Sequence, residues 1–292
     1  GVGIHSGRSV SMKLVPAPEG TGIVFRRVDL GSFLIPVREA EVLSTAYATT
    51  IGIGAVRIQT VEHLLAALYA FEIDNLFVEL NSEEVPIADG SAAPFVTLLW
   101  DAGIVEQGRV KRIIEIIAPI TITEAQENDK TKSIRIVPSS SFEISYTILF
   151  NHPLILSQSY TYQHTQERFI REIAPARTFG FLKDIKRLLE TGLARGGSLE
   201  NAIVVGEDKI LNQEGLRFPN EFVRHKILDL MGDLALIGMP ILGRLEAHHS
   251  GHQLHTKLIN LMRKNKGAFR VVSADSQERA AALSPVPALA AL

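Results

Sequence analysis

The order of strand-like and helix-like segments along the chain repeats once, and this repetition constrains the fold more than any other feature. In the first part, short segments rich in β-branched residues surround two helical patterns. The expected strands are residues 9–15, 22–27, 33–37 and 76–80, and the expected helices are residues 61–70 and 94–100. The second part has expected strands at 112–117, 120–123, 133–137, 142–149, 160–162, 202–205 and 241–246, and expected helices at 167–173, 181–191, 221–238 and 253–263. Strands and then helices, twice, predict an α+β fold of two domains of similar layout, each a β-sheet with a helical layer.

Two domains and a tail account for the length of the chain. The expected boundary lies at residues 107–111, which separates an N-terminal domain, 1–108, from a C-terminal domain, 109–270. Residues 271–292 are rich in alanine, contain two prolines, and predict a frayed helix or a disordered end. The 292 residues are 46% hydrophobic and 21% charged, which suits a chain that buries a substantial core.

Composition excludes several classes of function. The chain has no cysteine, so disulfides, thiolate zinc sites, iron–sulfur clusters and a cysteine nucleophile are excluded, and any metal must be held by histidine and carboxylate. The formal net charge is −2 and no run is rich in lysine and arginine, so no nucleic-acid partner is expected. No stretch approaches ~18 consecutive apolar residues, so we expect no transmembrane segment and a cytoplasmic protein.

The expected helix at 221–238 carries an imidazole and two carboxylates on one face. His225, Asp229 and Asp233 are spaced four residues apart, which brings them into one stripe. One interpretation is a solvated surface face, as charge stripes usually are. The residues between them are mostly apolar, however, and a buried carboxylate needs a partner such as a metal or a histidine. His225 and Asp229 are therefore a candidate pair of metal ligands.

A second candidate lies at the start of the expected helix 61–70, for which Thr60 is the expected N-cap. Adjacent helical residues point about 100° apart, so His63 could bind a metal while Glu62 faces the water bound to it. The alternative is a carboxylate favoured by the helix dipole beside a half-exposed histidine, and periodicity alone favours it. Together the two helices offer two histidines and one aspartate, a three-ligand set that leaves a position for water and is typical of catalytic zinc.

A third element is the segment HHSGH, residues 248–252, with three histidines beside a glycine in an expected turn. It could be a surface loop, a weak metal-binding tract, or the source of a general acid, since histidine titrates near neutrality. Asp233 would be an orienting partner for such an imidazole. Position alone does not choose between His248, His249 and His252.

Several motifs, in order along nearly the whole chain, resemble those of one enzyme family. They are GVGIHSG (1–7), TVEHLLAAL (60–68), IDN (73–75), PIADGSAAPF (86–95), ARTFGF (176–181), FVRHK (222–226), LD (228–229), GD (232–233) and SGH (250–252). The chain thereby resembles the zinc-dependent UDP-3-O-acyl-N-acetylglucosamine deacetylases, which catalyse the committed step of lipid A biosynthesis. The resemblance implies two α+β domains whose helices pack between the two sheets, each domain with a small insert.

The resemblance also implies roles for residues at matching positions. The metal ligands would be His63, His225 and Asp229, holding one Zn²⁺, although Fe²⁺ also suits such nitrogen and oxygen ligands. Zinc-bound water would attack the N-acetyl carbonyl, with Glu62 as general base and His252, paired with Asp233, as general acid. The products would be acetate and UDP-3-O-acyl-glucosamine.

Substrate-binding residues follow from the resemblance in the same way. Thr178 would donate a hydrogen bond to the carbonyl oxygen of the N-acetyl group, and Phe179 would lie beside the substrate. Lys226 would take part in recognising the nucleotide part of the substrate. The second insert, near residues 183–205, would form a passage for the acyl chain, with lining residues that include Leu188, Leu193 and Ile203. Ordinary core packing is the alternative for each of these three. The expected partner is thus a small molecule, acylated UDP-GlcNAc, bound by a monomer. A non-enzymatic lipid-binding module is the competing class.

Overall fold

The computed structural model describes residues 1–125 and 131–274. The first half of the chain forms a four-stranded sheet in the order β1-β7-β2-β3, in which β7 lies antiparallel to β1 and parallel to β2. Every second residue of β7 is buried, as expected for a strand with one face on a core. The elements are β1 (Met12–Pro16), β2 (Ile23–Arg27), β3 (Phe33–Pro36), β7 (Leu76–Leu80), α1 (Glu62–Ala70) and α2 (Ala93–Ala102).

The second half forms a seven-stranded sheet in the order β12-β11-β15-β10-β9, with β8 paired to β15 and β16 paired to β8. Strand β11 is its clearest alternating strand, and it lies antiparallel to β12 and parallel to β15. The elements are β8 (Arg112–Ile116), β9 (Ile120–Ala125), β10 (Thr131–Val137), β11 (Phe142–Leu149), β12 (Ser157–Gln163), β15 (Ile241–His248), β16 (Phe269–Ser273), α3 (Gln166–Arg168), α5 (Glu221–Leu234) and α6 (His252–Lys264).

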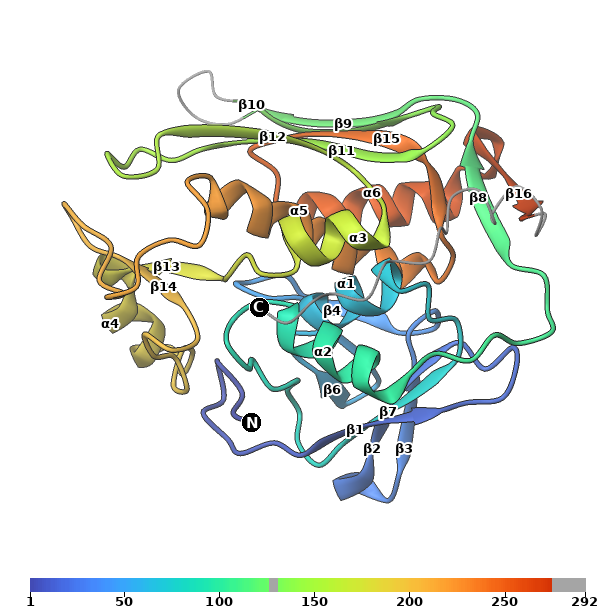
Figure 1. Ribbon diagram of the computed structural model, residues 1–292, viewed down its shortest axis with the longest axis horizontal. Helices are drawn as coiled ribbons and strands as arrows, with labels where there is room; N and C mark the ends of the chain where they lie inside the picture. The colour runs from blue at the N-terminus through green and yellow to red at the C-terminus, as the bar shows by residue number, and fades with distance from the viewer. Residues whose placement is uncertain (126–130, 275–292) are drawn as a thin grey trace.

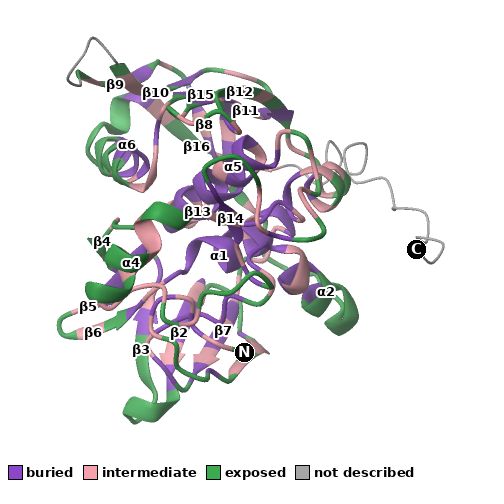
Figure 2. Cartoon of the chain, turned by 90° about the vertical axis from the view of Figure 1, so that its left-hand side faces the viewer, coloured by how far each residue is buried: buried purple, intermediate pink, exposed green. Residues whose placement is uncertain are grey.

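Helices α1, α2, α3, α5 and α6 lie between the two sheets, with α5, α6 and α3 under the larger sheet and α1 and α2 over the smaller one (Figure 1). Helices α1 and α5 are buried at the centre of the molecule (Figure 2). They touch at Gly232, where a Cβ atom would lie 1.9 Å from the carbonyl oxygen of Glu62, so only glycine fits this approach. The predicted α+β fold, with helices packed between two sheets, is confirmed.

Two small sheets complete the fold. One consists of β4 (Glu41–Ser44), β5 (Thr50–Ile53) and β6 (Val56–Ile58). The other consists of the paired strands β13 (Phe179–Phe181) and β14 (Ile203–Val205), and α4 (Leu182–Glu190) belongs to the connection between them along the chain. The sequence reading missed β4, β5, β6 and β13 because strands of three or four residues show almost no periodicity. Among the described residues, no helix is long and apolar enough to cross a membrane.

Local details correct three expectations. Helix α5 ends at Leu234 rather than at residue 238, and a 3₁₀ turn follows over Ala235–Ile237. The expected helix 167–173 is one short α-helical turn, α3, followed by a π-helical turn at Phe169–Ile173. Thr60 does not cap α1, because it adopts φ 57° and donates its hydroxyl to Glu84 Oε1 at 3.0 Å.

The expected domain boundary lies in a connecting segment, whereas the expected tail begins inside a strand. The boundary at residue 108 lies in the segment between α2 and β8, and the division into domains stays a prediction. The expected start of the tail, residue 271, lies within β16, whose pairing with β8 joins it to the larger sheet. The rest of the tail, residues 275–292, lies outside the described residues.

Candidate active site

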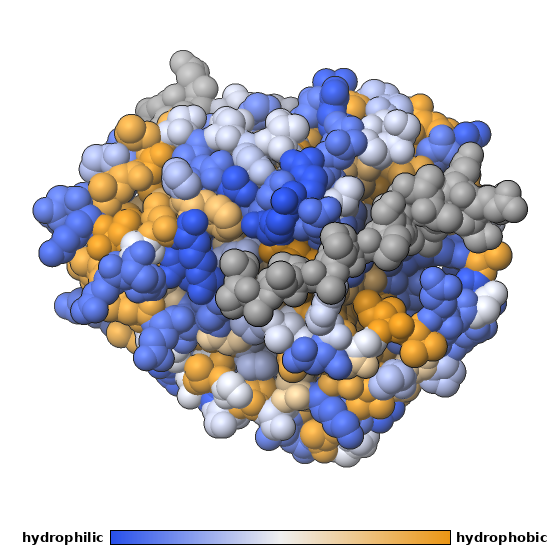
Figure 3. Space-filling view, viewed as in Figure 1, coloured by the Kyte–Doolittle hydropathy of each residue, from blue (hydrophilic) through white to orange (hydrophobic). Residues whose placement is uncertain are grey.

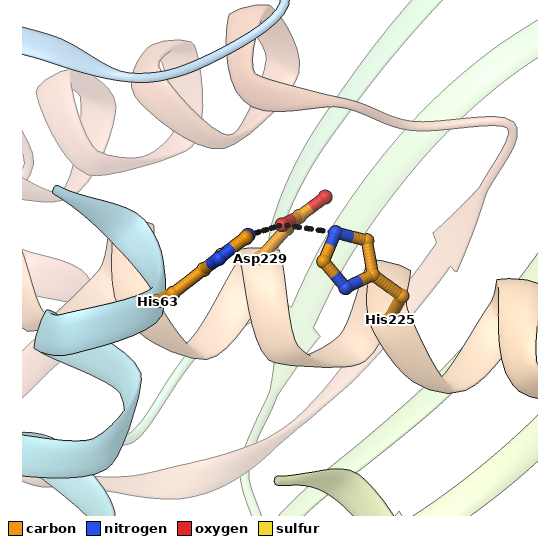
Figure 4. Close-up of side chains that lie close together, drawn as sticks. All are labelled: His63, His225 and Asp229. Carbon is orange, nitrogen blue, oxygen red and sulfur yellow. Dashed lines mark ion pairs between the residues drawn. The ribbon is translucent and has the colours of Figure 1, made fainter. Parts of the chain in front are cut away.

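The three predicted metal ligands lie together where α1 faces α5. His63 comes from α1, and His225 and Asp229 come from successive turns of α5 (Figure 4). Asp229 Oδ1 lies 3.7 Å from His63 Nε2 and 3.3 Å from His225 Nε2, and all three residues are buried. One ligand atom from each residue lies within 4.8 Å of the others, so the group could hold a metal ion.

The orientation of both imidazoles suits metal binding through Nε2. His225 Nδ1 lies 3.1 Å from the carbonyl oxygen of Ala176, which places the proton on Nδ1 and leaves Nε2 as the free lone pair. Burial lowers the pKa of His225 to about 4, so the ring is neutral at neutral pH, as a ligand must be. Among the described residues, His63 Nδ1 is buried without a hydrogen-bond partner.

Lys226 pairs with the carboxylate of the same cluster. Its Nζ lies 2.7 Å from Asp229 Oδ2, and its side chain is only 15% exposed. Burial acts to raise the pKa of Asp229, but His225 and Lys226 outweigh it and hold that pKa well below its ordinary value. Lys226 therefore neutralises the oxygen of Asp229 that does not face His225, a contact that the sequence did not predict.

Asp233 accepts hydrogen bonds from three side chains. Its Oδ2 lies 2.7 Å from His252 Nδ1 and 2.7 Å from His255 Nδ1, and its Oδ1 accepts from Thr49 Oγ1 at 2.5 Å. Asp233 is completely buried, so these donors are what keep its charge stable. Of the histidines left open by the sequence, His252 contacts Asp233, whereas His248 ends β15 with its side chain exposed.

The Asp233 carboxylate keeps His252 protonated. Burial acts to lower the pKa of His252, but Asp233 reverses the effect and raises it to about 9. Burial likewise acts to raise the pKa of Asp233, and the two histidines bring it below its ordinary value. At neutral pH the pair is therefore an imidazolium and a carboxylate, with His252 Nε2 3.8 Å from Asp229 Oδ2, at the ligand cluster.

Glu62 faces the same space. Its carboxylate accepts a hydrogen bond from the backbone N–H of Thr49 at 3.0 Å, and an oxygen of Glu62 lies within 4.8 Å of both an Asp229 oxygen and a His252 nitrogen. Burial raises the pKa of Glu62, although His252 and His63 act against it. A carboxylate with a raised pKa next to a protonated imidazole is an arrangement found in acid–base catalysis.

The ARTFGF segment, residues 176–181, packs against His225 and the start of α5. The carbonyl oxygen of Ala176 accepts the hydrogen bond from His225 Nδ1, and Thr178 and Phe179 follow shortly after it in the chain. The centroid of the Phe179 ring lies 6.2 Å from that of the His225 ring. Arg177 anchors this segment to the start of α5, since its Nε lies 2.9 Å from Glu221 Oε1 and both side chains are buried. The backbone N–H of Arg177 donates to the same Glu221 oxygen at 3.0 Å.

Three residues of the site were missed by sequence reasoning. His255, Thr49 and Tyr146 all belong to the network around Asp233, and Tyr146 OH lies 3.3 Å from His255 Nε2. The spacing of three residues between His252 and His255 could have indicated two imidazoles on one helix face. No local pattern marks Thr49 or Tyr146.

Comparison with known proteins identifies the family. The profile of the family described as UDP-3-O-acyl N-acetylglycosamine deacetylase matches residues 1–264. The chain belongs to this family. A deacetylase of that name from Myxococcus xanthus is 49% identical over 279 residues, which cover 95% of this chain and 87% of the relative. Deacetylases from Anaeromyxobacter sp. and Saccharophagus degradans are 46% and 45% identical, over 98% and 95% of this chain and 92% and 91% of their own lengths.

The region near residues 183–205, for which the resemblance predicts an insert, contains most of α4 and all of β14. Figure 3 shows apolar surface gathered at the left of the molecule, where these elements lie, and Leu182, Leu189 and Leu199 are exposed there. Leu188 and Leu193 are half-buried, but Ile203 is completely buried in the core. Ile203 thus presents no surface to a ligand in this structure, and the lining of an acyl passage stays a prediction.

Proposed function

We propose that this chain is a zinc-dependent deacetylase that hydrolyses the N-acetyl group of UDP-3-O-acyl-N-acetylglucosamine, giving acetate and UDP-3-O-acyl-glucosamine. The relatives are named as deacetylases of this substrate, and the family resemblance implies that the reaction is the committed step of lipid A biosynthesis. One observation carries the proposal. A three-residue nitrogen and oxygen cluster lies directly beside a buried glutamate and an imidazolium held by an aspartate.

The donor set fits zinc. His63, His225 and Asp229 would hold the ion through Nε2, Nε2 and a carboxylate oxygen, and three protein ligands leave a position for water. Fe²⁺ suits the same donors, and metal analysis of the purified protein distinguishes the two ions. When bound, the ion would supply Lewis acidity, which polarises a carbonyl and lowers the pKa of bound water towards ~7.

Different side chains around the ligand cluster carry out the two proton transfers of the reaction. Glu62, ionised in the active enzyme, accepts the proton of the attacking water and acts as general base. His252, protonated and oriented by Asp233, donates a proton to the departing sugar nitrogen as the C–N bond breaks. Thr178 donates a hydrogen bond to the carbonyl oxygen, whose negative charge grows during attack.

Substrate binding extends from the cluster over the insert. Phe179 would lie beside the sugar, and Leu188 and Leu193 would contact the acyl chain together with the exposed leucines of the same insert. Ile203 would support that surface from the core. Lys226 would orient the nucleotide part only after releasing Asp229 Oδ2, so its main role in the resting enzyme is to stabilise Asp229. A monomer acting in the cytoplasm remains our expectation.

The test is acetate release from UDP-3-O-acyl-N-acetylglucosamine, measured on the zinc-loaded enzyme. We expect Glu62→Gln to lower kcat by ~10²–10⁴-fold while about one zinc per chain is retained. Removal of a ligand by His225→Ala should release the zinc. The exposed His248→Ala serves as the matched control and should leave turnover unchanged. A zinc-loaded enzyme without acetate release, or Glu62→Gln with wild-type turnover, would refute the proposal.

A further inference from the structure

The hydrogen bonds of Asp233 come from more than the proposed general acid. Asp233 Oδ2 accepts from His252 Nδ1 and from His255 Nδ1, each at 2.7 Å. His255 lies one turn after His252 on α6 and is completely buried. The same oxygen is therefore shared equally by a ring at the site and a ring behind it.

The surroundings of His255 define its tautomer. Its Nδ1 faces a carboxylate oxygen, so Nδ1 carries the proton. Its Nε2 lies 3.3 Å from the hydroxyl of Tyr146, a residue of β11 that is completely buried, and that hydroxyl can donate to a neutral Nε2. Burial lowers the pKa of His255, which agrees with a neutral ring. The chain of donors thus runs from Tyr146 to His255 to Asp233.

This arrangement has a consequence for the position of Asp233. A carboxylate oxygen with two donors from one helix is held from two directions, whereas one with a single donor can rotate about the Cβ–Cγ bond. Thr49 holds the other oxygen, and of the two donors to Oδ2 one is His252 itself, so His255 is the donor that keeps Oδ2 in place independently of His252. The direction of the Asp233–His252 hydrogen bond, and with it the aim of His252 Nε2, depends on that constraint.

We propose that His255 is a positioning residue, whose Nδ1–H, backed by the Tyr146 hydroxyl, fixes the carboxylate oxygen of Asp233 that orients His252. The inference rests on the proposed role of His252 as general acid. His255 itself makes no contact with substrate in this scheme. Its contribution lies in kcat rather than in KM, because it affects the orientation of the acid and not the binding of the sugar nucleotide.

The test compares His255→Leu with His255→Asn in the zinc-loaded full chain, using acetate release. Leucine removes the donor, whereas the amide of asparagine places an N–H close to the position of Nδ1. We expect His255→Leu to lower kcat by ~10-fold or more, with KM and zinc content unchanged, and His255→Asn to recover most of the loss. Equal losses in both variants would assign His255 a merely structural role and overturn the proposal. Wild-type kcat in His255→Leu would overturn it as well.

Tyr146→Phe provides an independent measurement, and it decides the question if His255→Leu does not fold. We expect kcat to fall several-fold with KM unchanged, and the effect to disappear when His255 is already leucine, because the two groups act in series. An unchanged kcat in Tyr146→Phe would overturn the proposal. Failure of the proposed function is a separate outcome, since wild-type enzyme would then release no acetate.

Discussion

Replacing Gly232 with alanine tests whether the contact between α1 and α5 sets the geometry of the site. A Cβ atom at this position would lie 1.9 Å from the carbonyl oxygen of Glu62 and 2.6 Å from its carbonyl carbon. Real Cβ atoms essentially never approach a neighbour within 3.0 Å, so the two helices must separate here by about 1 Å. The clash is with backbone, so no side-chain rotation relieves it.

Two losses follow from this separation. Overpacking of this kind costs about 1–3 kcal/mol of folding free energy. The separation also moves Glu62 and His63 on α1 away from His225, Asp229 and Asp233 on α5, and a misplacement of ~1 Å can cost ~10²-fold in rate. We therefore expect Gly232→Ala to lose far more activity than its stability loss explains.

Urea denaturation and acetate release, measured on the same zinc-loaded preparation, check both expectations. Gly267→Ala is the matched control, because a Cβ at position 267 meets only Asn265 Oδ1 at 3.7 Å, an ordinary contact. It should leave stability and turnover close to those of the wild type. A Gly232→Ala enzyme with wild-type stability and wild-type turnover would refute the reasoning.

Three further predictions concern metal, pH and the anchor of the ARTFGF segment. Chelation should abolish acetate release and lower the midpoint of thermal unfolding, and added zinc should restore both; turnover that survives complete metal removal would contradict the zinc proposal. Because the pKa of His252 rises from 6.5 to about 9 on folding, its contribution to the free energy of unfolding is complete below pH 6.5 and is lost as the pH rises through about 9. Turnover should decline over the same alkaline range, and on the acid side as Glu62 is protonated; a flat pH profile up to about pH 10 would count against His252 as the acid. Arg177→Met should cost about 3–5 kcal/mol in urea denaturation, because it leaves the buried carboxylate of Glu221 uncompensated, whereas an effect below ~1 kcal/mol would show that the pair is dispensable.

Much of the site could be predicted from short segments of sequence. Helical spacing placed His225, Asp229 and Asp233 on one face of α5, and the structure confirms that they share it. The pairing of Asp233 with His252 was also expected, and the two lie 2.7 Å apart. The periodicity of α1 favoured a half-exposed His63 beside a Glu62 stabilised by the helix dipole, and that interpretation was wrong, because the structure shows both side chains buried.

Other features depended on segments that meet only in the folded chain. Thr49 precedes β5, Tyr146 lies on β11 and His255 lies on α6, yet all three belong to the network around Asp233. The position of Lys226 against Asp229, rather than free for a ligand, likewise depends on the burial of both side chains. Local patterns do not contain such contacts, because they arise from packing between elements far apart in sequence.

The sequence by itself determined which residues share a helix face, because the α-helix repeats every 3.6 residues whatever surrounds it. It also determined that any metal ligands are histidine and carboxylate, since the chain has no cysteine. Tertiary structure alone decided how the faces meet. The contact of Gly232 with Glu62 brings α1 against α5, and the packing of α6 brings two imidazoles to Asp233. The physical reason is that periodicity acts within one element, whereas an active site is formed by the close packing of several.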